Sequence, residues 1–237
     1  MTCVAVLWAV AFAMRPIPAG ATGRDFLDET VLSRGFEAQE LGFELGLESR
    51  LDIDYRVQGW YTTEIEFAPT SRLLLECVGQ LADRGRGLDT GGWRAGMRYR
   101  LGRPWRSPVD VSAAVEFEYE PADAKRPSIE RILVPRFVVS RVFADLVTMT
   151  ANVGPAHRFG SFSDTRWAYS FGVRVPEGRP LEVGFEYVHE PLERSTRLAP
   201  QIWLMFPYHL RMRLGGVFGT EARPYWFTGR AIVEVEF

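Results

Sequence analysis

The stretch LGFELGLESRLDIDY, residues 41–55, alternates apolar and polar side chains along most of its length. Successive side chains of an extended strand point to opposite faces, so Leu41, Phe43, Leu45 and Leu47 would share one face. Glycine and glutamate occupy the positions between these four residues. A period of two is typical of a half-buried β-strand and does not fit a helix.

The same alternation recurs to the C-terminus and predicts an all-β protein. No segment after residue 36 has the apolar spacing of an amphipathic helix. We expect twelve strands, near residues 40–55, 59–67, 72–82, 92–101, 109–120, 130–141, 146–154, 166–175, 180–190, 197–205, 209–219 and 225–237.

The expected connections alternate in length along the chain, except for the first one, a short link near residues 56–58. The short ones lie at 68–71, 102–108, 142–145, 176–179 and 206–208. The longer, polar ones lie at 83–91, 121–129, 155–165, 191–196 and 220–224. This alternation is typical of an antiparallel up-and-down transmembrane β-barrel, with tight periplasmic turns and longer external loops. A soluble sandwich with Greek-key connections has no reason to sort its loops in this way. We therefore predict a twelve-stranded barrel over residues 39–237.

Aromatic residues on the apolar face gather near strand ends, as expected for side chains at two membrane interfaces. The predicted interface aromatics are Tyr61, Trp93, Tyr119, Trp167, Tyr187 and Tyr225 at the loop ends, and Tyr99 and Phe237 at the turn ends. A soluble barrel that binds a lipophilic ligand is the alternative, because alternation alone does not say which face meets water.

The final residue, Phe237, ends an alternating strand, which resembles the C-terminal pattern of bacterial outer-membrane proteins. The stretches ELGFELGLE (40–48), WYTTEIEFAPTSRLLLECV (60–78) and GGWRAGMRYRLG (91–102) resemble outer-membrane transporters grouped with phenol-degradation-pathway proteins. The resemblance is one of pattern over residues 36–237. It implies a channel or transporter, without a substrate and without catalytic or binding residues to carry over.

In this arrangement the polar face lines the barrel lumen. The predicted lumen-lining basic residues are Arg72, Arg94, Arg98, Arg100, Arg136, Arg174, Arg211, Arg213 and Arg230. The predicted lumen-lining acidic residues are Glu44, Glu48, Glu64, Glu66, Glu76, Asp110, Glu116, Glu118, Glu182, Glu186, Glu234 and Glu236. Three interpretations stay open: cross-strand ion pairs that rigidify the wall, an electrostatic filter in a narrow channel, and a lumen plugged by its own charges.

Charge and composition narrow the function further. The chain of 237 residues carries 28 Lys and Arg against 30 Asp and Glu, and Lys125 is its only lysine. A net charge of −2 argues against a protein held to nucleic acid by bulk electrostatics. The two cysteines and three histidines have no zinc-binding spacing, and we expect neither a metal nor a cofactor.

The N-terminus has the features of a targeting segment. Residues 4–14 form an apolar run, and Ala19-Gly20-Ala21 fits a signal-peptidase site. We expect a signal peptide at 1–21, a periplasmic or lumen-plugging segment at 22–38, and a location in the outer membrane of a Gram-negative bacterium. A buried hydrophobic segment is the alternative interpretation of the run.

These observations favour a non-enzymatic channel that passes small polar or aromatic solutes through a narrow charged lumen. Its expected partners are outer-membrane lipid, an unidentified solute, and the barrel-assembly machinery through the C-terminal strand. A non-conducting structural or adhesive barrel is the main alternative. A lipid-modifying enzyme would need a Ser-His pair at the outer rim, for which His157 with Ser161 is a candidate.

Overall fold

The computed structural model describes most of the barrel region of the chain. The described residues are 38–52, 57–83, 87–102, 109–121, 129–160, 163–190, 192, 195–220 and 225–237. The expected signal peptide at 1–21, and residues 22–37 of the expected N-terminal segment, lie outside them. No helix in these described ranges is long and apolar enough to cross a membrane.

Twelve strands make up nearly all of the described chain, as the alternation predicted. Their bounds are β1 Glu40–Asp52, β2 Val57–Thr70, β3 Leu73–Asp83, β4 Leu88–Arg100, β5 Asp110–Glu120, β6 Glu130–Phe143, β7 Val147–Phe159, β8 Asp164–Val175, β9 Leu181–Glu190, β10 Ser195–Phe206, β11 Leu210–Thr220 and β12 Tyr225–Glu236.

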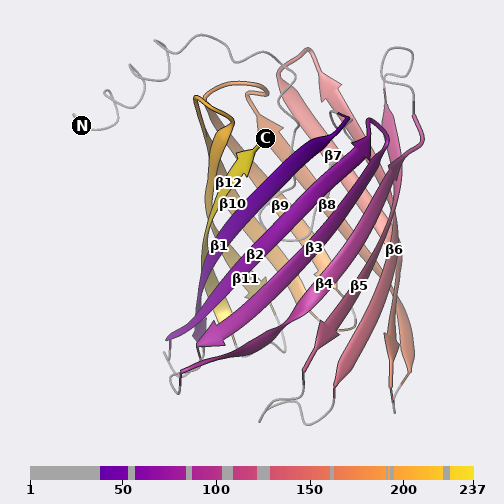
Figure 1. The fold of residues 1–237 in the computed structure, drawn as a ribbon, viewed down its shortest axis with the longest axis vertical. Helices are drawn as coiled ribbons and strands as arrows, with labels where there is room; N and C mark the ends of the chain where they lie inside the picture. The colour runs from indigo at the N-terminus through magenta and orange to yellow at the C-terminus, as the bar shows by residue number, and fades with distance from the viewer. Residues whose placement is uncertain are drawn as a thin grey trace, which may run out of the picture.

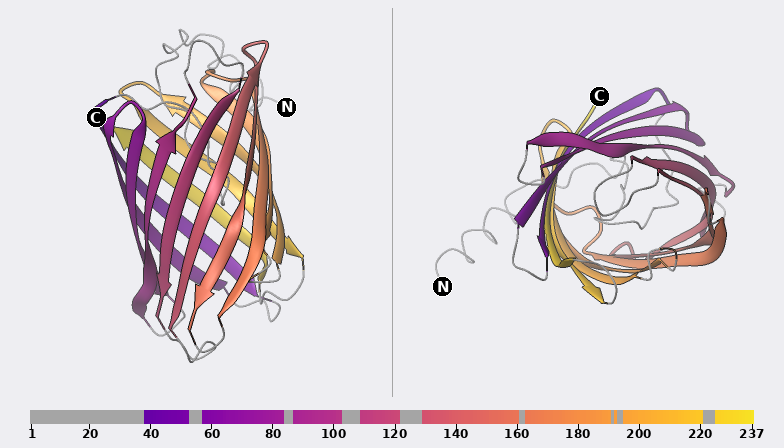
Figure 2. Two further views of the ribbon diagram at one scale, coloured as in Figure 1. Left: turned by 90° about the vertical axis from the view of Figure 1, so that its right-hand side faces the viewer. Right: turned by 90° about the horizontal axis from the view of Figure 1, so that it is seen from below.

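The strands form a closed antiparallel barrel in which each strand pairs with its neighbours in the sequence (Figure 1). The barrel closes where β1 pairs with β12, with Gly42 opposite Glu236. Leu41 and Phe237 exchange backbone hydrogen bonds of 3.2 and 2.9 Å beyond this ladder. Figure 2 shows the closed ring from one end. The prediction of a twelve-stranded up-and-down barrel is confirmed.

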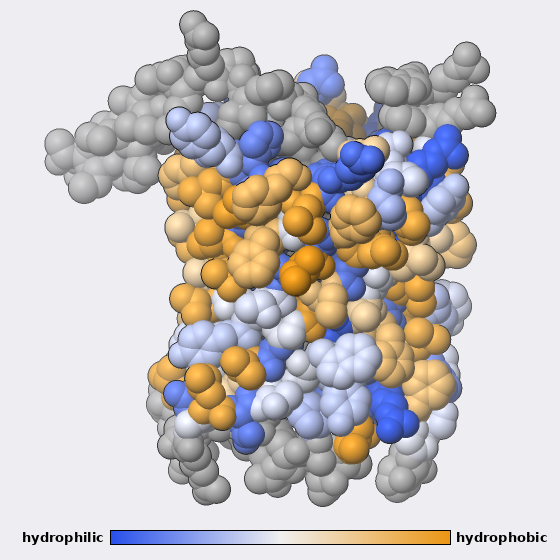
Figure 3. All heavy atoms as spheres, in the orientation of Figure 1, coloured by the Kyte–Doolittle hydropathy of each residue, from blue (hydrophilic) through white to orange (hydrophobic). Residues whose placement is uncertain are grey.

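The two faces of the wall differ in chemistry. Leu45, Ile65, Phe137 and Trp167 are among the large apolar side chains that point outward and are exposed. On the face drawn in Figure 3, apolar side chains cover much of the upper half of the wall, and the lower half mixes them with residues of intermediate and polar character. The inward positions between them are buried or half-buried and mostly polar. In the described strands the interior is therefore mostly polar, with charged residues that face one another and small apolar clusters between them.

The ladder between β6 and β7 has a gap at a proline. The two strands pair from Arg131 to Leu133 and again from Phe137 to Phe143, and the register is the same on both sides of the gap. Pro135 lies in the interruption, and proline has no N–H to donate to a ladder. Gly154 faces this point, where its backbone approaches Pro135 so closely that an added Cβ would lie 1.8 Å from the Pro135 carbonyl oxygen.

Candidate functional site: the charged lumen

The inner face carries the charged residues that the alternation assigned to it, with one exception. Eight of the nine predicted arginines and all twelve predicted acidic residues occupy inward, buried or half-buried positions of the strands. These arginines are Arg94, Arg98, Arg100, Arg136, Arg174, Arg211, Arg213 and Arg230. The acidic residues are Glu44, Glu48, Glu64, Glu66, Glu76, Asp110, Glu116, Glu118, Glu182, Glu186, Glu234 and Glu236.

Arg72 is the exception, and the prediction that it lines the lumen is wrong. Arg72 lies in the tight turn between β2 and β3, where its side chain is exposed. The Thr70 hydroxyl accepts hydrogen bonds from the backbone N–H groups of Arg72 and Leu73, at 3.3 and 3.2 Å. This turn takes Arg72 out of the extended conformation, so the alternation of faces does not apply to it.

Six carboxylates lie on the four adjacent strands β12, β1, β2 and β3, toward the end of the barrel that carries the β2–β3 turn and the last residue of β12. We call them the acidic band: Glu44, Glu64, Glu66, Glu76, Glu234 and Glu236. Glu44 lies directly opposite both Glu234 and Glu64, and Glu66 lies opposite Glu76. Like charges in register repel each other, so the band is stable only where cations lie beside it.

Arginines on both sides of the acidic band supply those cations. Arg213 of β11 reaches over β12 to form an ion pair with Glu44. On the other side, Arg94 lies 4.0 Å from Glu64 and Arg98 lies 3.7 Å from Glu76. Pairs such as Arg213 with Glu44 skip a strand, so they connect parts of the wall that share no backbone hydrogen bonds.

Oxygen atoms of Glu64, Glu66 and Glu76 lie within 4.8 Å of one another, a spacing that suits a cation. Arg98 beside Glu76 already provides positive charge here. The arrangement is therefore that of an ion-pair network in the lumen wall.

A second network lies on β8 and β9. The Arg174 guanidinium donates to Glu177 at 3.1 Å and lies 2.9 Å from a Glu182 oxygen. The Cζ atom of Arg174 lies 5.5 Å from the centre of the Trp203 ring, within cation–π range. Buried charges remain in place only when they are paired in this way.

Several inward residues were missed by the sequence analysis. Trp203 is 1% exposed and lies inside the barrel, although both faces of its strand carry apolar residues and alternation gives no direction there. Trp60 also faces inward, and the Arg50 guanidinium stacks over its ring at 3.9 Å. Arg158 and Arg197 extend the basic set. Arg158 lies beyond the expected strand 146–154 and would have been found by continuing its alternation, whereas Arg197 is the first residue of the expected strand 197–205 and was overlooked.

The predicted interface aromatics that the structure describes lie on the outer face. Trp93 and Tyr119 stack with ring centres 5.8 Å apart at one end of β4 and β5. Tyr169 of β8 stacks on both Tyr187 and His189 of β9, with ring centres 6.1 and 4.7 Å apart. Tyr61, Tyr99, Trp167 and Phe237 are outward and exposed, whereas the side chain of Tyr225 lies outside the described part. Their role at a membrane interface stays a prediction.

The candidate enzyme residues are only partly described. His157 shares a 2.6 Å hydrogen bond with the Thr165 hydroxyl and packs against Phe159. Ser161, its expected partner, lies outside the described residues.

Comparisons with known proteins support the fold. No family model and no curated protein matches the chain. Among solved structures, the KdgM porin matches with a TM-score of 0.60 at 10% identity, over 83% of this chain and 99% of its own. An outer membrane channel from Pseudomonas putida F1 matches with a TM-score of 0.62 at 14% identity, over 91% of this chain and 100% of its own. KdgM in complex with disordered oligogalacturonate matches with a TM-score of 0.56 at 9% identity, over 83% of this chain and 98% of its own. The chain thus has the fold of outer-membrane channel barrels.

Proposed function

We propose that the protein is an outer-membrane channel that passes small polar or aromatic solutes through a narrow charged lumen. The observation that carries this proposal is the division of the barrel wall into an apolar outer face and a charged inner face. A wall of this kind suits lipid outside and water-soluble cargo inside. The likeness to solved channels supports the same conclusion at the level of the fold.

The inner face also determines which ions such a channel would favour. Carboxylates outnumber guanidiniums on the inner face of the described strands, and the acidic band concentrates them at one end. A narrow pore with low-dielectric walls strengthens the field of such charges, because water screens them less than at an open surface. Cations should therefore pass more readily than anions of the same size.

A planar lipid bilayer tests the proposal directly. Purified protein, refolded in detergent and added to the bilayer in potassium chloride, should produce stepwise increases of conductance. Folding is checked in the same sample by heat-modifiable migration on a gel. Folded protein that yields neither conductance steps nor solute uptake into liposomes would overturn the proposal.

A non-conducting structural barrel is the second candidate, and one observation favours it. Many inward side chains, including Glu182, Glu186, Arg174 and Thr148, are almost completely buried, as in a packed interior. A wide aqueous pore would leave them exposed. The same bilayer experiment separates the two candidates, because a closed barrel folds and shows no steps.

We also propose that the protein lies in the outer membrane of a Gram-negative bacterium and assembles there through its C-terminal strand. Support comes from β12, which pairs with β1 and so completes the barrel. Changing Phe237 to Ala should lower the amount of folded protein in the outer-membrane fraction and leave its synthesis unchanged. Recovery of the wild-type protein in the soluble fraction would exclude this location.

A further inference from the structure

A group of apolar side chains interrupts the charged inner face on four neighbouring strands. Ile132 and Val134 of β6, Ala156 of β7, Ala168 of β8 and Val188 of β9 all occupy inward positions. All but Ala168 are less than 5% exposed. We call these five residues the inner apolar patch. A channel that carried only hydrated ions would gain nothing from such a surface.

Leu192, from the connection between β9 and β10, lies on this patch. Its side chain is 8% exposed and packs in one cluster with Ile132, Val134 and Ala156. The Arg158 guanidinium donates a 3.2 Å hydrogen bond to the Leu192 carbonyl oxygen. Because β7 and β8 separate β9 from β6, Leu192 can contact β6 only from the inside of the barrel.

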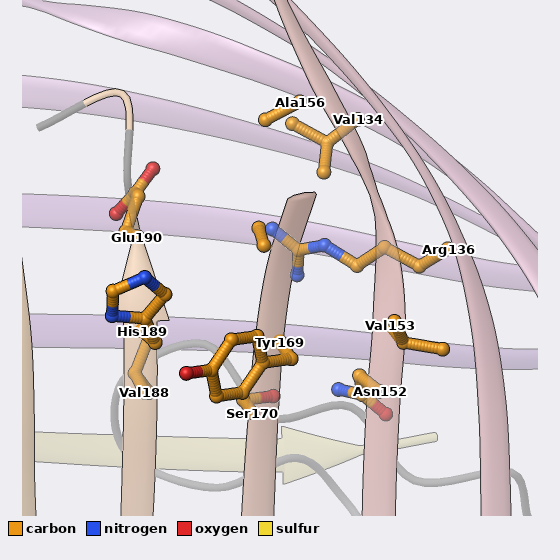
Figure 4. Close-up of a pocket in the computed structure, with 11 residues that line it drawn as sticks. Val134, Arg136, Asn152, Val153, Ala156, Tyr169, Ser170, Val188, His189 and Glu190 are labelled. Carbon is orange, nitrogen blue, oxygen red and sulfur yellow. The ribbon is translucent and has the colours of Figure 1, made fainter. Parts of the chain in front are cut away.

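A cavity adjoins the place that Leu192 occupies. Val134, Ala156, Ala168 and Val188 of the patch line it (Figure 4). Val153, Tyr169 and His189, which lie at outward positions of their strands, line it as well. Its polar lining includes Arg136, Asn152, Ser170 and Glu190, and Figure 4 shows the long Arg136 side chain running across the cavity. The cavity has a volume of about 20 Å³, which is room for about one water molecule, so a solute could bind here only by displacing a side chain beside the cavity.

We propose that the inner apolar patch binds the apolar group of a small amphipathic solute, and that Leu192 holds this place when the solute is absent. The inference deepens the proposed channel function and rests on it for its role in transport. The size of the Leu192 side chain indicates the size of the apolar group that the patch can bind. Because the cavity has room for about one water, the charged head of the solute would lie in the lumen beside the patch.

L-leucine and glycine are matched probes, because they share one zwitterionic head and differ only in the side chain. The full-length protein is studied in planar bilayers for current block and in detergent micelles for saturation-transfer NMR of the free amino acid. L-leucine should interrupt the current and show saturation transfer at its methyl groups, whereas glycine at the same concentration should do neither.

Three variants test whether L-leucine blocks the current by binding to the inner apolar patch. Leu192→Ala uncovers the patch and should lower the half-blocking concentration of L-leucine about fourfold, because less apolar surface has to be displaced. Val188→Thr keeps the shape of the wall but adds a hydroxyl, and should raise that concentration about fourfold. Val138→Thr is the matched control, since Val138 is a buried inward valine of β6 outside the patch.

The two measurements separate the possible failures. Conductance steps without any difference between L-leucine and glycine, in the wild type and in Leu192→Ala, would overturn the patch as a binding site. An equal response of Val138→Thr and Val188→Thr would also overturn it. Saturation transfer to the L-leucine methyl groups from a folded protein that shows no conductance would support the binding site and exclude the channel function.

Discussion

Removing the Arg174 side-chain charge should destabilise the barrel strongly, because it leaves a buried carboxylate without its cation. Glu182 is fully buried, and its side chain lies 2.9 Å from Arg174, whose own side chain is 2% exposed. Loss of one partner from a buried ion pair costs about 3–5 kcal/mol. The substitution Arg174→Met, which retains much of the side-chain volume, should therefore shift the folding equilibrium by about two to three and a half orders of magnitude.

Urea titration in lipid vesicles measures this change, with folded protein quantified by heat-modifiable migration. Arg166→Met is the matched control, because its ion pair with Asp164 is 41% and 42% exposed and such pairs contribute at most about 1 kcal/mol. The double variant Arg174→Met/Glu182→Gln should recover part of the loss, since it no longer buries an unpaired charge. A loss in Arg174→Met no larger than in Arg166→Met would refute the reasoning.

Three further predictions follow from other parts of the wall. Gly154→Ala should lower stability by about 1–3 kcal/mol in the same urea titration, because its Cβ would meet the β6 backbone. Gly79→Ala, whose Cβ would have only an ordinary 3.4 Å contact, should change stability little and serves as the control. In a potassium chloride gradient the reversal potential should have the sign of cation preference, and replacing band glutamates with glutamine should weaken it. An anion preference in the wild type would contradict the charge assignment. In a Cys3→Ser variant, Cys77 points outward from β3 and should resist a charged maleimide in liposomes until the protein is unfolded. Rapid labelling of the folded protein would place that face in water.

The sequence was sufficient to predict the barrel and the direction of most side chains, because both follow from a period of two. Strands such as β5 carry charge on one face only, so alternation identifies the lumen side without any knowledge of neighbours. Which charged side chains pair with each other was harder to predict from the sequence. The ion pair of Arg213 with Glu44 spans two strand-to-strand steps, and it depends on barrel curvature that local sequence does not encode.

Strands with apolar residues on both faces were the other source of misses. Around Ile132, Leu133 and Val134 either face could have been assigned to lipid, so the inner apolar patch was not foreseen. Trp203 was missed for the same reason. Arg72 was misplaced because the alternation was continued through a turn, where the backbone is no longer extended.

The junction of β1 and β12 has a consequence for how the chain reaches its folded state. It joins Gly42 to Glu236, so the contacts that complete the ring are among the most distant along the sequence. Contacts between residues this far apart in the sequence form slowly, because chain entropy is lost before any pairing energy is gained. Until they form, the hydrogen-bonding groups of both end strands are free to pair with another copy of the chain. Ring closure should therefore be the slow step of refolding, and misassembly into aggregates should rise with protein concentration before it.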